Sequence, residues 1–278
     1  MRHRGRMRKQ WRYVGVFCEE FLLCAARVRV GPMGQTFWAF VDRSRGDGEI
    51  EERTGIRLPG ARGEVWSERA AGGVWPIGAD EPGVITRVDS KLLKAKLTIG
   101  EGEWVEAVCP TGEGEGAGEG YVWTRKRIAP IACEISLPDG RMFKTRARGI
   151  EDESCGYHPR RTVWSWSAGV GTAADGRAVG WNLVSGINDP PVNSERGIWV
   201  EGESPREPGP VTFDGLEGIE FAEGGRLDFS AEAERRADQN LGIVAYDYVQ
   251  PFGSFSGSLA GIELDSGLGV MEHHDAKW

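Results

Sequence analysis

Apolar and polar residues alternate over many short stretches of this chain, and glycine-containing turns separate the stretches. A period of two in segments rich in Val, Trp and Phe is typical of β-strands. Roughly sixteen such segments, most of them about 8–12 residues apart or more, predict an all-β protein with little helix. The expected strands include residues 11–17, 20–30, 35–42, 84–89, 92–99, 103–108, 120–136, 141–148, 163–170, 177–187, 226–235, 242–249 and 252–259.

This number of strands exceeds the capacity of one small barrel. Two packed antiparallel β-barrels or sandwiches are therefore expected, with a seam near Gly149 that divides the chain into units 1–149 and 150–278. The triplets at 138–140 and 174–176, each ending in Asp-Gly, predict hairpin turns. No linker rich in Pro or Ser separates the halves, so the two units are expected to pack closely.

Two further segments have an unusual composition. Residues 112–120 (GEGEGAGEG) lack side chains able to build a core, and they predict an exposed loop. Residues 231–241 have a composition that suits a helix but almost no apolar face, so they are interpreted as a strand that runs on into a loop.

Composition and charge exclude several classes of protein. The 278 residues are 40% hydrophobic, which excludes a disordered chain, and no stretch of eighteen apolar residues predicts a membrane span. The net charge of −8 (34 basic minus 42 acidic residues) argues against a nucleic-acid partner. The five cysteines are odd in number and lack CxxC spacing, so free thiols and a cytoplasmic location are expected. The basic residues before Trp11 resemble the start of a signal peptide, but Glu19 and Glu20 interrupt the apolar stretch that follows.

Residues 151–166 hold the densest set of chemically useful side chains. Three carboxylates that include Asp152, together with His158 and two arginines that include Arg161, directly precede an alternating strand. Trp164 and Trp166 are two residues apart and therefore face one side of that strand, where they can line a cavity next to the acids. The plainer alternative, which the composition favours, is a loop held by Arg–carboxylate pairs, with both tryptophans in ordinary core.

Two other segments are polar within apolar surroundings. Asn182 follows Trp181 in an apolar strand and Asn188 lies in a turn, where ordinary turn chemistry is the simpler interpretation. Near the C-terminus, His273 and His274 suggest a metal, but neighbouring residues of a strand point to opposite faces and no zinc-type spacing is present. We therefore expect no metal and no organic cofactor, and we interpret these histidines as acid–base or hydrogen-bonding groups.

Several of these segments together resemble a bacterial family called domain of unknown function 2804. The family form carries an acid at the position of His273, whereas His274 keeps the family pattern. The resemblance extends over most of the chain and rests on residues 11–13, 153–160, 162–166, 180–184, 188–191, 251–257 and 269–278.

The family itself is distantly similar to lipocalin-like proteins built as two linked β-barrels, among them carotenoid hydratases and tocopherol cyclases. This implies a lipocalin-like double barrel and a ligand class, but not a reaction.

Two functions from different classes follow. The first is a cofactor-free enzyme that protonates an unsaturated, largely apolar small molecule and directs its hydration, isomerisation or cyclisation. Its expected catalytic residues are Asp152, His158, Glu272 and His274. Its expected ligand-binding residues are Arg161, Trp164, Trp166, Trp181, Asn182 and Asn188.

The second function is a non-catalytic carrier of an apolar ligand in the same pocket. A third interpretation is that the charged clusters only tie the two β-units together. Trp11, Trp38 and Trp123 are interpreted as ordinary strand residues. The sequence leaves open the oligomeric state and whether the segments 151–166, 181–196 and 271–278 meet in space.

Overall fold

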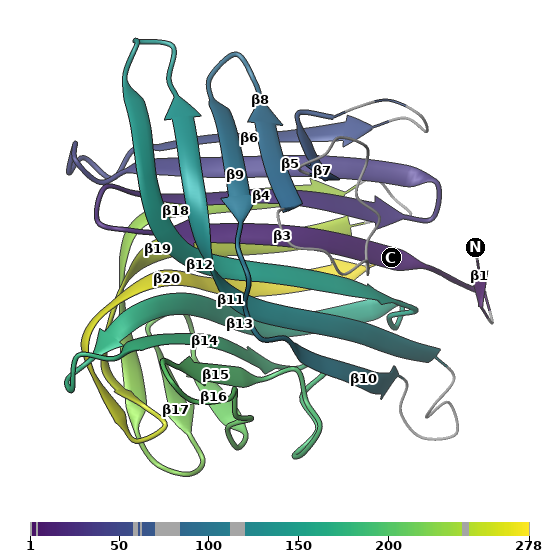
Figure 1. Ribbon diagram of the computed structural model, residues 1–278. Coiled ribbons are helices and arrows are strands. Elements are labelled where there is room, and N and C mark those ends of the chain that lie inside the picture. Colours follow the sequence, from purple (N-terminus) through teal and green to yellow (C-terminus); the bar gives the residue numbers. More distant parts are fainter. Residues whose placement is uncertain are drawn as a thin grey trace.

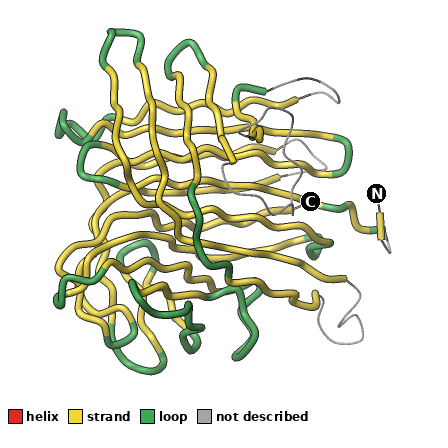
Figure 2. Tube along the Cα trace, viewed as in Figure 1, coloured by secondary structure: helices red, strands yellow, loops and turns green. Residues whose placement is uncertain are grey.

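The regular structure in the described part of this chain consists of antiparallel strands (Figures 1 and 2). The computed structural model describes residues 2–3, 5–57, 61, 63–69, 84–111, 120–240 and 245–277. These ranges contain twenty strands, which confirms the all-β prediction and exceeds the sixteen or so strands expected. No helix in them has the length and apolar character needed to cross a membrane. Most of the predicted loop at 112–120 lies outside the described residues, and Gly120 begins a strand.

The first sheet is formed by residues of the N-terminal half. Its hydrogen-bonded order is β6-β5-β4-β3-β12-β11-β9-β8-β7, and β10 pairs with β11 beside this path. The long hairpin of β11 and β12 bends along its length in Figure 1. The strands are β3 (Lys9–Phe17), β4 (Phe21–Val30), β5 (Met33–Asp42), β6 (Ile50–Arg57), β7 (Val65–Arg69), β8 (Val84–Asp89), β9 (Lys94–Ile99), β10 (Val105–Thr111), β11 (Gly120–Ser136) and β12 (Met142–Gly156), preceded by the small pair β1 (Arg2–His3) and β2 (Arg6–Met7).

The second sheet is formed by the rest of the chain, with the order β15-β14-β13-β20-β19-β18-β17-β16. Residues 231–240 lie in β18, which confirms the strand predicted there despite its helical composition, whereas residue 241 lies outside the described residues. The strands are β13 (Arg161–Ala173), β14 (Ala178–Ser185), β15 (Gly197–Val200), β16 (Val211–Asp214), β17 (Gly218–Phe221), β18 (Arg226–Asn240), β19 (Ala245–Leu259) and β20 (Ile262–Lys277).

Three apolar clusters show how the two sheets are arranged. One cluster contains only residues of the first sheet and the segments near it, such as Phe40 and Leu97. A second contains only residues of the second sheet and its loops, such as Trp181 and Phe255. The third joins residues of both sheets, for example Tyr13 and Trp166, and therefore forms the layer between them. Each sheet thus has an apolar interior of its own and shares a third one with its partner.

The strands at the centre are buried on both faces, and their alternation distributes side chains between these interiors. In β3, Val14 belongs to the interior of the first sheet, whereas Tyr13 belongs to the shared layer. In β14, Leu183 belongs to the interior of the second sheet and Val184 to the shared layer. A shift of one residue in register would exchange the two sets.

Tight turns connect the strands where the sequence predicted them. Gly140 and Gly176 end the two predicted hairpin turns with φ angles of 90° and 88°. Glycine adopts this left-handed region without the steric cost that a Cβ atom brings.

The change from the first sheet to the second falls at residues 157–160, whereas Gly149, the expected seam, lies inside β12. Cys155 lies near the end of the same strand, and all five cysteines are free thiols.

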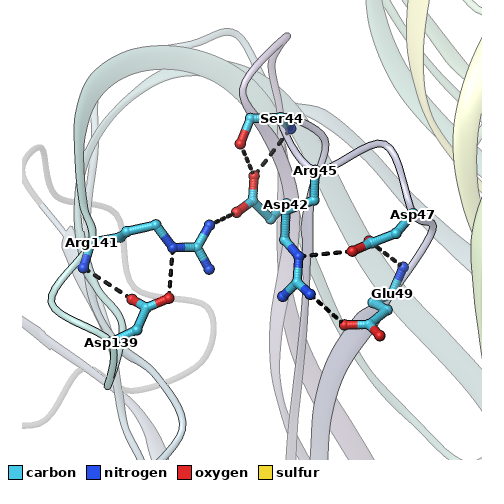
Figure 3. A network of polar contacts seen from close by, with 7 residues as sticks. All are labelled: Asp42, Ser44, Arg45, Asp47, Glu49, Asp139 and Arg141. Carbon is cyan, nitrogen blue, oxygen red and sulfur yellow. Dashed lines mark hydrogen bonds and ion pairs between the residues drawn. The ribbon is translucent and has the colours of Figure 1, made fainter.

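A network of polar contacts joins the turn after β5 to the turn between β11 and β12. Arg141 pairs with Asp139 at 2.7 Å and also with Asp42, whose other oxygen accepts a hydrogen bond from the Ser44 hydroxyl at 2.6 Å. The network ties together two turns that are almost a hundred residues apart in the chain (|i−j| = 99 for Arg141 and Asp42). Figure 3 shows its members: Asp42, Ser44, Arg45, Asp47, Glu49, Asp139 and Arg141.

Replacement of Gly169 by alanine tests the packing of the second interior. A Cβ atom at Gly169 would collide with the ring of Trp181, which is fully buried and packs edge-on against Phe255 at 5.0 Å between ring centroids. We expect Gly169→Ala to lower the free energy of unfolding by about 1–3 kcal/mol, the usual cost of overpacking a core. Urea denaturation measures this change.

Gly55→Ala is the matched control, because a Cβ atom there meets only Thr36 Oγ1, at 3.9 Å. It should change the free energy of unfolding by no more than about 0.5 kcal/mol. Equal stability of the two variants would mean that Trp181 can move aside without cost.

Candidate functional site

A cavity of about 110 Å³ lies in the layer between the two sheets. Its wall is mostly aromatic and aliphatic, with a small number of ionisable groups. The first sheet contributes Trp11, Tyr13, Ala26, Val28, Phe37, Lys126 and Asp152. The second sheet and the loop after β14 contribute Trp164, Trp166, Ile187, Asn188, Glu195, Tyr248, Glu272 and His274.

Strand pairing explains why these residues meet. Asp152 of β12 lies opposite Tyr13 of β3, so both side chains leave the first sheet on the face that the second sheet covers. In the second sheet, Trp166 lies opposite Glu272. One step further along the strands, Trp164 and Tyr248 flank His274 from either side. Paired residues share a face, so each of these sets is directed toward the shared layer.

Glu272 is a buried carboxyl group with neutral hydrogen-bond donors. Its side chain accepts hydrogen bonds from Trp164 Nε1 at 2.8 Å and Gln250 Nε2 at 2.9 Å, and the residue is 8% exposed. It has no ion-pair partner among the described residues. Burial raises the pKa of Glu272 to about 7, because two neutral donors do not compensate for the lost hydration of the anion. The group can therefore both donate and accept a proton near neutral pH.

Asp152 is a carboxyl group of a different kind, because a cation neutralises it. Lys126 Nζ lies 2.5 Å from Asp152 Oδ1 and 3.6 Å from Glu195 Oε1, and all three side chains are buried. Burial raises the pKa of Asp152 to about 6 in spite of the opposing charge of Lys126. Burial alone would lower the pKa of Lys126, but the charges of Asp152 and Glu195 raise it, so the lysine stays charged. The charge of Asp152 also contributes to the raised pKa of Glu272.

His274 is buried among aromatic rings. Its ring centroid lies 4.1 Å from that of Trp164, 5.1 Å from that of Tyr248 and 5.9 Å from that of Tyr246. Burial lowers the pKa of His274 to about 3, so the imidazole is neutral at pH 7. His273 points the other way, with Nδ1 3.3 Å from the hydroxyl of Ser165, as the alternation of a strand predicted.

A chain of hydrogen bonds positions the wall around Trp166. Trp166 Nε1 donates to Asn182 Oδ1 at 2.7 Å, and Asn182 Nδ2 donates to the carbonyl of Glu195 at 2.8 Å. Asn188 has a φ of 49° and donates from Nδ2 to Glu195 Oε2 at 2.9 Å. The hydrogen bonds to Glu195 hold the loop after β14 against the cavity. Asn182 lies behind Trp166 and fixes the position of its ring.

The opposite face of the same strands carries an ion-pair network. Glu151 and Glu153 point into the interior of the first sheet, where they pair with Arg12, Arg125 and Arg127. The two arginines of β11 stack on Trp104, with guanidinium carbons 4.1 and 4.4 Å from its ring centroid. Glu151 and Glu153 are therefore held by Arg–carboxylate pairs, but in strand β12 and not in the loop that the plainer alternative expected. Asp152 between them faces the cavity and pairs with Lys126.

The structure answers the question of convergence: the segments 151–166, 181–196 and 271–278 all contribute to this one cavity. Six of the ten residues singled out in the sequence line it, namely Asp152, Trp164, Trp166, Asn188, Glu272 and His274. Within the described part of the chain, no group of three or more His, Cys, Asp and Glu side chains is arranged to hold a metal ion.

The other four residues do not line the cavity. His158 is fully buried behind its wall, with its ring 4.9 Å from Trp11, and burial lowers its pKa to about 3. Arg161 lies at the outer end of β13, where its side chain is 70% exposed and pairs with Asp275 at 2.7 Å. Trp181 belongs to the interior of the second sheet. Asn182 lies behind Trp166, and because it adjoins Trp181 in one strand, the two could not both face the ligand.

Sequence analysis missed most of the first-sheet half of the cavity. Trp11 lines the cavity, although it was interpreted as an ordinary strand residue, and Tyr13 lies beside it on the same face. Lys126 also lines the cavity. One signal for it was available: Arg125, Lys126 and Arg127 form a cationic run inside an otherwise apolar strand, and charged residues are buried only when they are paired.

Two antiparallel sheets around a shared layer give this chain a lipocalin-like double β-barrel fold. A protein assigned as AttH from Nitrosomonas europaea has the same fold, with a TM-score of 0.62 at 14% identity over 96% of this chain and 92% of that one. Kievitone hydratase from Nectria haematococca superimposes with a TM-score of 0.56 at 9% identity over 97% of this chain and 88% of that one. CghA, solved with Sch210972, gives a TM-score of 0.51 at 10% identity over 98% and 88% of the two chains.

The family model for the domain of unknown function DUF2804 matches residues 89–278, so the chain belongs to that family. No curated protein matches the chain.

The raised pKa of Glu272 predicts how the stability of the protein depends on pH. Its pKa in the folded protein, about 7, lies above the ordinary value of 4.5. The stabilisation that comes from protonated Glu272 is fully present below about pH 4.5 and is lost as the pH rises through about 7. Glu272→Gln cannot ionise, so its stability relative to the wild type should increase by about 3 kcal/mol between pH 4 and pH 8.

Urea unfolding of the wild type and of Glu272→Gln across this pH range measures the difference. The matched control is Glu263→Gln, which alters an exposed glutamate on the same strand. If the stability difference between wild type and Glu272→Gln stayed constant with pH, burial would not hold the proton on Glu272.

Proposed function

We propose that this protein is a cofactor-free enzyme that transfers protons to and from a small, largely apolar, unsaturated molecule bound between its two sheets. The observation that carries the proposal is Glu272, a buried carboxyl group with a pKa of about 7 in the wall of an aromatic cavity. A carboxylic acid that stays protonated near neutral pH can act as a general acid.

Glu272 is assigned the role of general acid. Trp164 Nε1 and Gln250 Nε2 hold its two oxygens in place. These donors keep the carboxyl group in one orientation but do not supply the positive charge that would lower its pKa strongly. The proton of Glu272 is therefore available to an unsaturated carbon of a bound molecule, and the bond that forms is C–H.

Asp152 is assigned the role of base. Its pKa of about 6 lies below that of Glu272, so at pH 7 it is the more ionised of the two groups. In an isomerisation or cyclisation it takes a proton from the neighbouring carbon, and in a hydration it takes one from the attacking water. Lys126 keeps Asp152 ionised until it accepts the proton.

The aromatic wall is assigned the role of stabilising the positive charge that develops on the substrate. The faces of Trp164 and Trp166 can attract a cation that develops when Glu272 gives up its proton. His274 is neutral at pH 7, so it adds no opposing charge next to the acid. Its proposed role is to hold Trp164 and Tyr248 in place through ring contacts.

A carrier of an apolar ligand is the second candidate function. It uses the same aromatic wall, and the favouring observation is the small size of the cavity, which leaves little room for an attacking water beside a ligand. A carrier has no need for a carboxyl group with a raised pKa, however, because burial of such a group costs stability at neutral pH.

Whichever function holds, we propose that the protein works in the cytosol, where its five free cysteines would remain reduced.

Native mass spectrometry of the purified protein would first identify a small molecule retained in the cavity. That molecule is then incubated with the protein in D₂O, where protonation by an enzyme leaves carbon-bound deuterium in the recovered compound. We expect Glu272→Gln and Asp152→Asn to lower the rate of deuterium incorporation by roughly 10²–10⁴-fold, the usual contribution of a positioned acid or base. Ligand affinity should change by no more than about threefold, because the shape of the wall is kept.

Glu263→Gln serves as the matched control, since it alters an exposed carboxyl group elsewhere on β20, and it should keep the wild-type rate. Tight retention of a ligand without any deuterium incorporation by the wild type would support the carrier and contradict the enzyme. If the rate of deuterium incorporation is unchanged in both Glu272→Gln and Asp152→Asn, these two carboxyl groups take no part in the reaction.

A further inference from the structure

Two phenol groups in the cavity wall are buried without a partner at ideal hydrogen-bond geometry. Tyr13 comes from β3 of the first sheet and Tyr248 from β19 of the second, and both line the cavity. Both are buried, with residue exposures of 5% and 6%. Neither hydroxyl has a partner at ideal hydrogen-bond geometry among the described residues; the nearest groups are the Glu272 carboxyl beside Tyr248 and the Cys24 thiol beside Tyr13.

Both groups are held as donors. Burial raises the pKa of each phenol well above 10, and the nearby Glu272 raises it further, so both keep their protons at neutral pH. A buried hydroxyl without a partner costs free energy, and that cost is recovered when an acceptor arrives. Both side chains line the same cavity, one from each sheet.

The rings that carry these hydroxyls are fixed in place. Tyr13 packs edge-on against Trp166, with 5.3 Å between ring centroids. Tyr248 lies under the guanidinium of Arg235 at 4.9 Å, and that guanidinium also covers Phe37 at 4.1 Å. Arg235 is in turn fixed across the layer by Glu52, at 2.8 Å. Donors on rigid rings lose little entropy when they bind an oxygen atom.

We propose that Tyr13 and Tyr248 bind the oxygen of a neutral ketone or aldehyde, so that the cavity selects small cyclic carbonyl compounds. The two phenols donate to the two lone pairs of the carbonyl oxygen, one from each sheet. The remainder of the molecule then lies against Trp164 and Trp166.

The charges around the cavity favour a neutral oxygen over an anionic one. Asp152, Glu195 and Glu272 all line the cavity, whereas Lys126 is the one cation among its lining residues. A carboxylate or phosphate ligand would be repelled by this excess of acids. A volume of about 110 Å³ also limits the ligand, because a cavity of roughly 150 Å³ is known to accept benzene. One six-membered ring is thus about the largest rigid unit that fits without movement of the wall.

This inference rests on the proposed use of the cavity as a small-molecule site, and it narrows the substrate class. A double bond conjugated to the bound carbonyl would be polarised by the two phenols, which prepares it for proton transfer with Glu272 and Asp152. The binding of a carbonyl compound does not require turnover, so the two proposals can fail separately.

The test uses cyclohexanone with a ¹³C-labelled carbonyl as the probe, and methylenecyclohexane as a probe of the same shape without the oxygen. Protein NMR titration gives the Kd of each probe, and the carbonyl carbon shift reports hydrogen bonding to its oxygen. We expect Tyr13→Phe and Tyr248→Phe each to weaken cyclohexanone binding by roughly two- to tenfold and to reverse part of the carbonyl shift. Binding of methylenecyclohexane should be unchanged or tighter, which also shows that the variants are folded.

Tyr246→Phe is the matched control: this tyrosine belongs to the same strand, but its hydroxyl accepts a hydrogen bond from Gln35 Nε2 at 3.2 Å and is not part of the cavity wall. It should leave both affinities as they are. Equal losses for the two probes, no loss for cyclohexanone, or binding of cyclohexanol as tight as that of cyclohexanone would each overturn the proposal. Glu272→Gln separates the two proposals, because it should lower the rate of deuterium incorporation into the retained molecule while the two-phenol dependence of cyclohexanone binding remains.

Discussion

The whole arrangement depends on strands that are buried on both faces. In an ordinary half-exposed sheet one face meets water, but here the central strands of each sheet separate two buried interiors. The strict alternation of a strand then decides which interior each side chain enters. The apolar residues and the charged residues follow the same rule, so the position of a residue within its strand settles whether it meets an arginine cluster, a ligand cavity or a packed core.

The run Glu151-Asp152-Glu153 shows this constraint most clearly. Three acids in a row look like one cluster in the sequence, but the strand directs the outer two towards arginines and the middle one towards the cavity. The glutamates become part of a buried ion-pair network, for which the cost of desolvation offsets much of the Coulomb attraction. Asp152 pairs with a single lysine that it shares with Glu195, and its pKa stays raised.

Much of the fold could be predicted from the sequence, because alternation and glycine turns are local signals. The two hairpin turns, the strand that contains Arg235 and the two-sheet architecture all followed from them. The cavity could be predicted only in part. Trp164, Glu272 and His274 stood out because they lie in unusual local sequences. Tyr13 and Lys126 reach the same cavity through pairing between distant strands, which no local pattern reports. Trp181 and Asn182 were assigned together because both are unusual, although neighbours in a strand cannot share a face.

The cavity lies in the layer by which the two sheets adhere, and its wall is formed in almost equal parts by both of them. A molecule that binds there therefore contacts both halves of the protein at once and adds to their cohesion. By linkage, binding must strengthen the association of the sheets as much as that association strengthens binding. Any change that loosens the layer, even at a distance from the cavity, is therefore also a change in affinity.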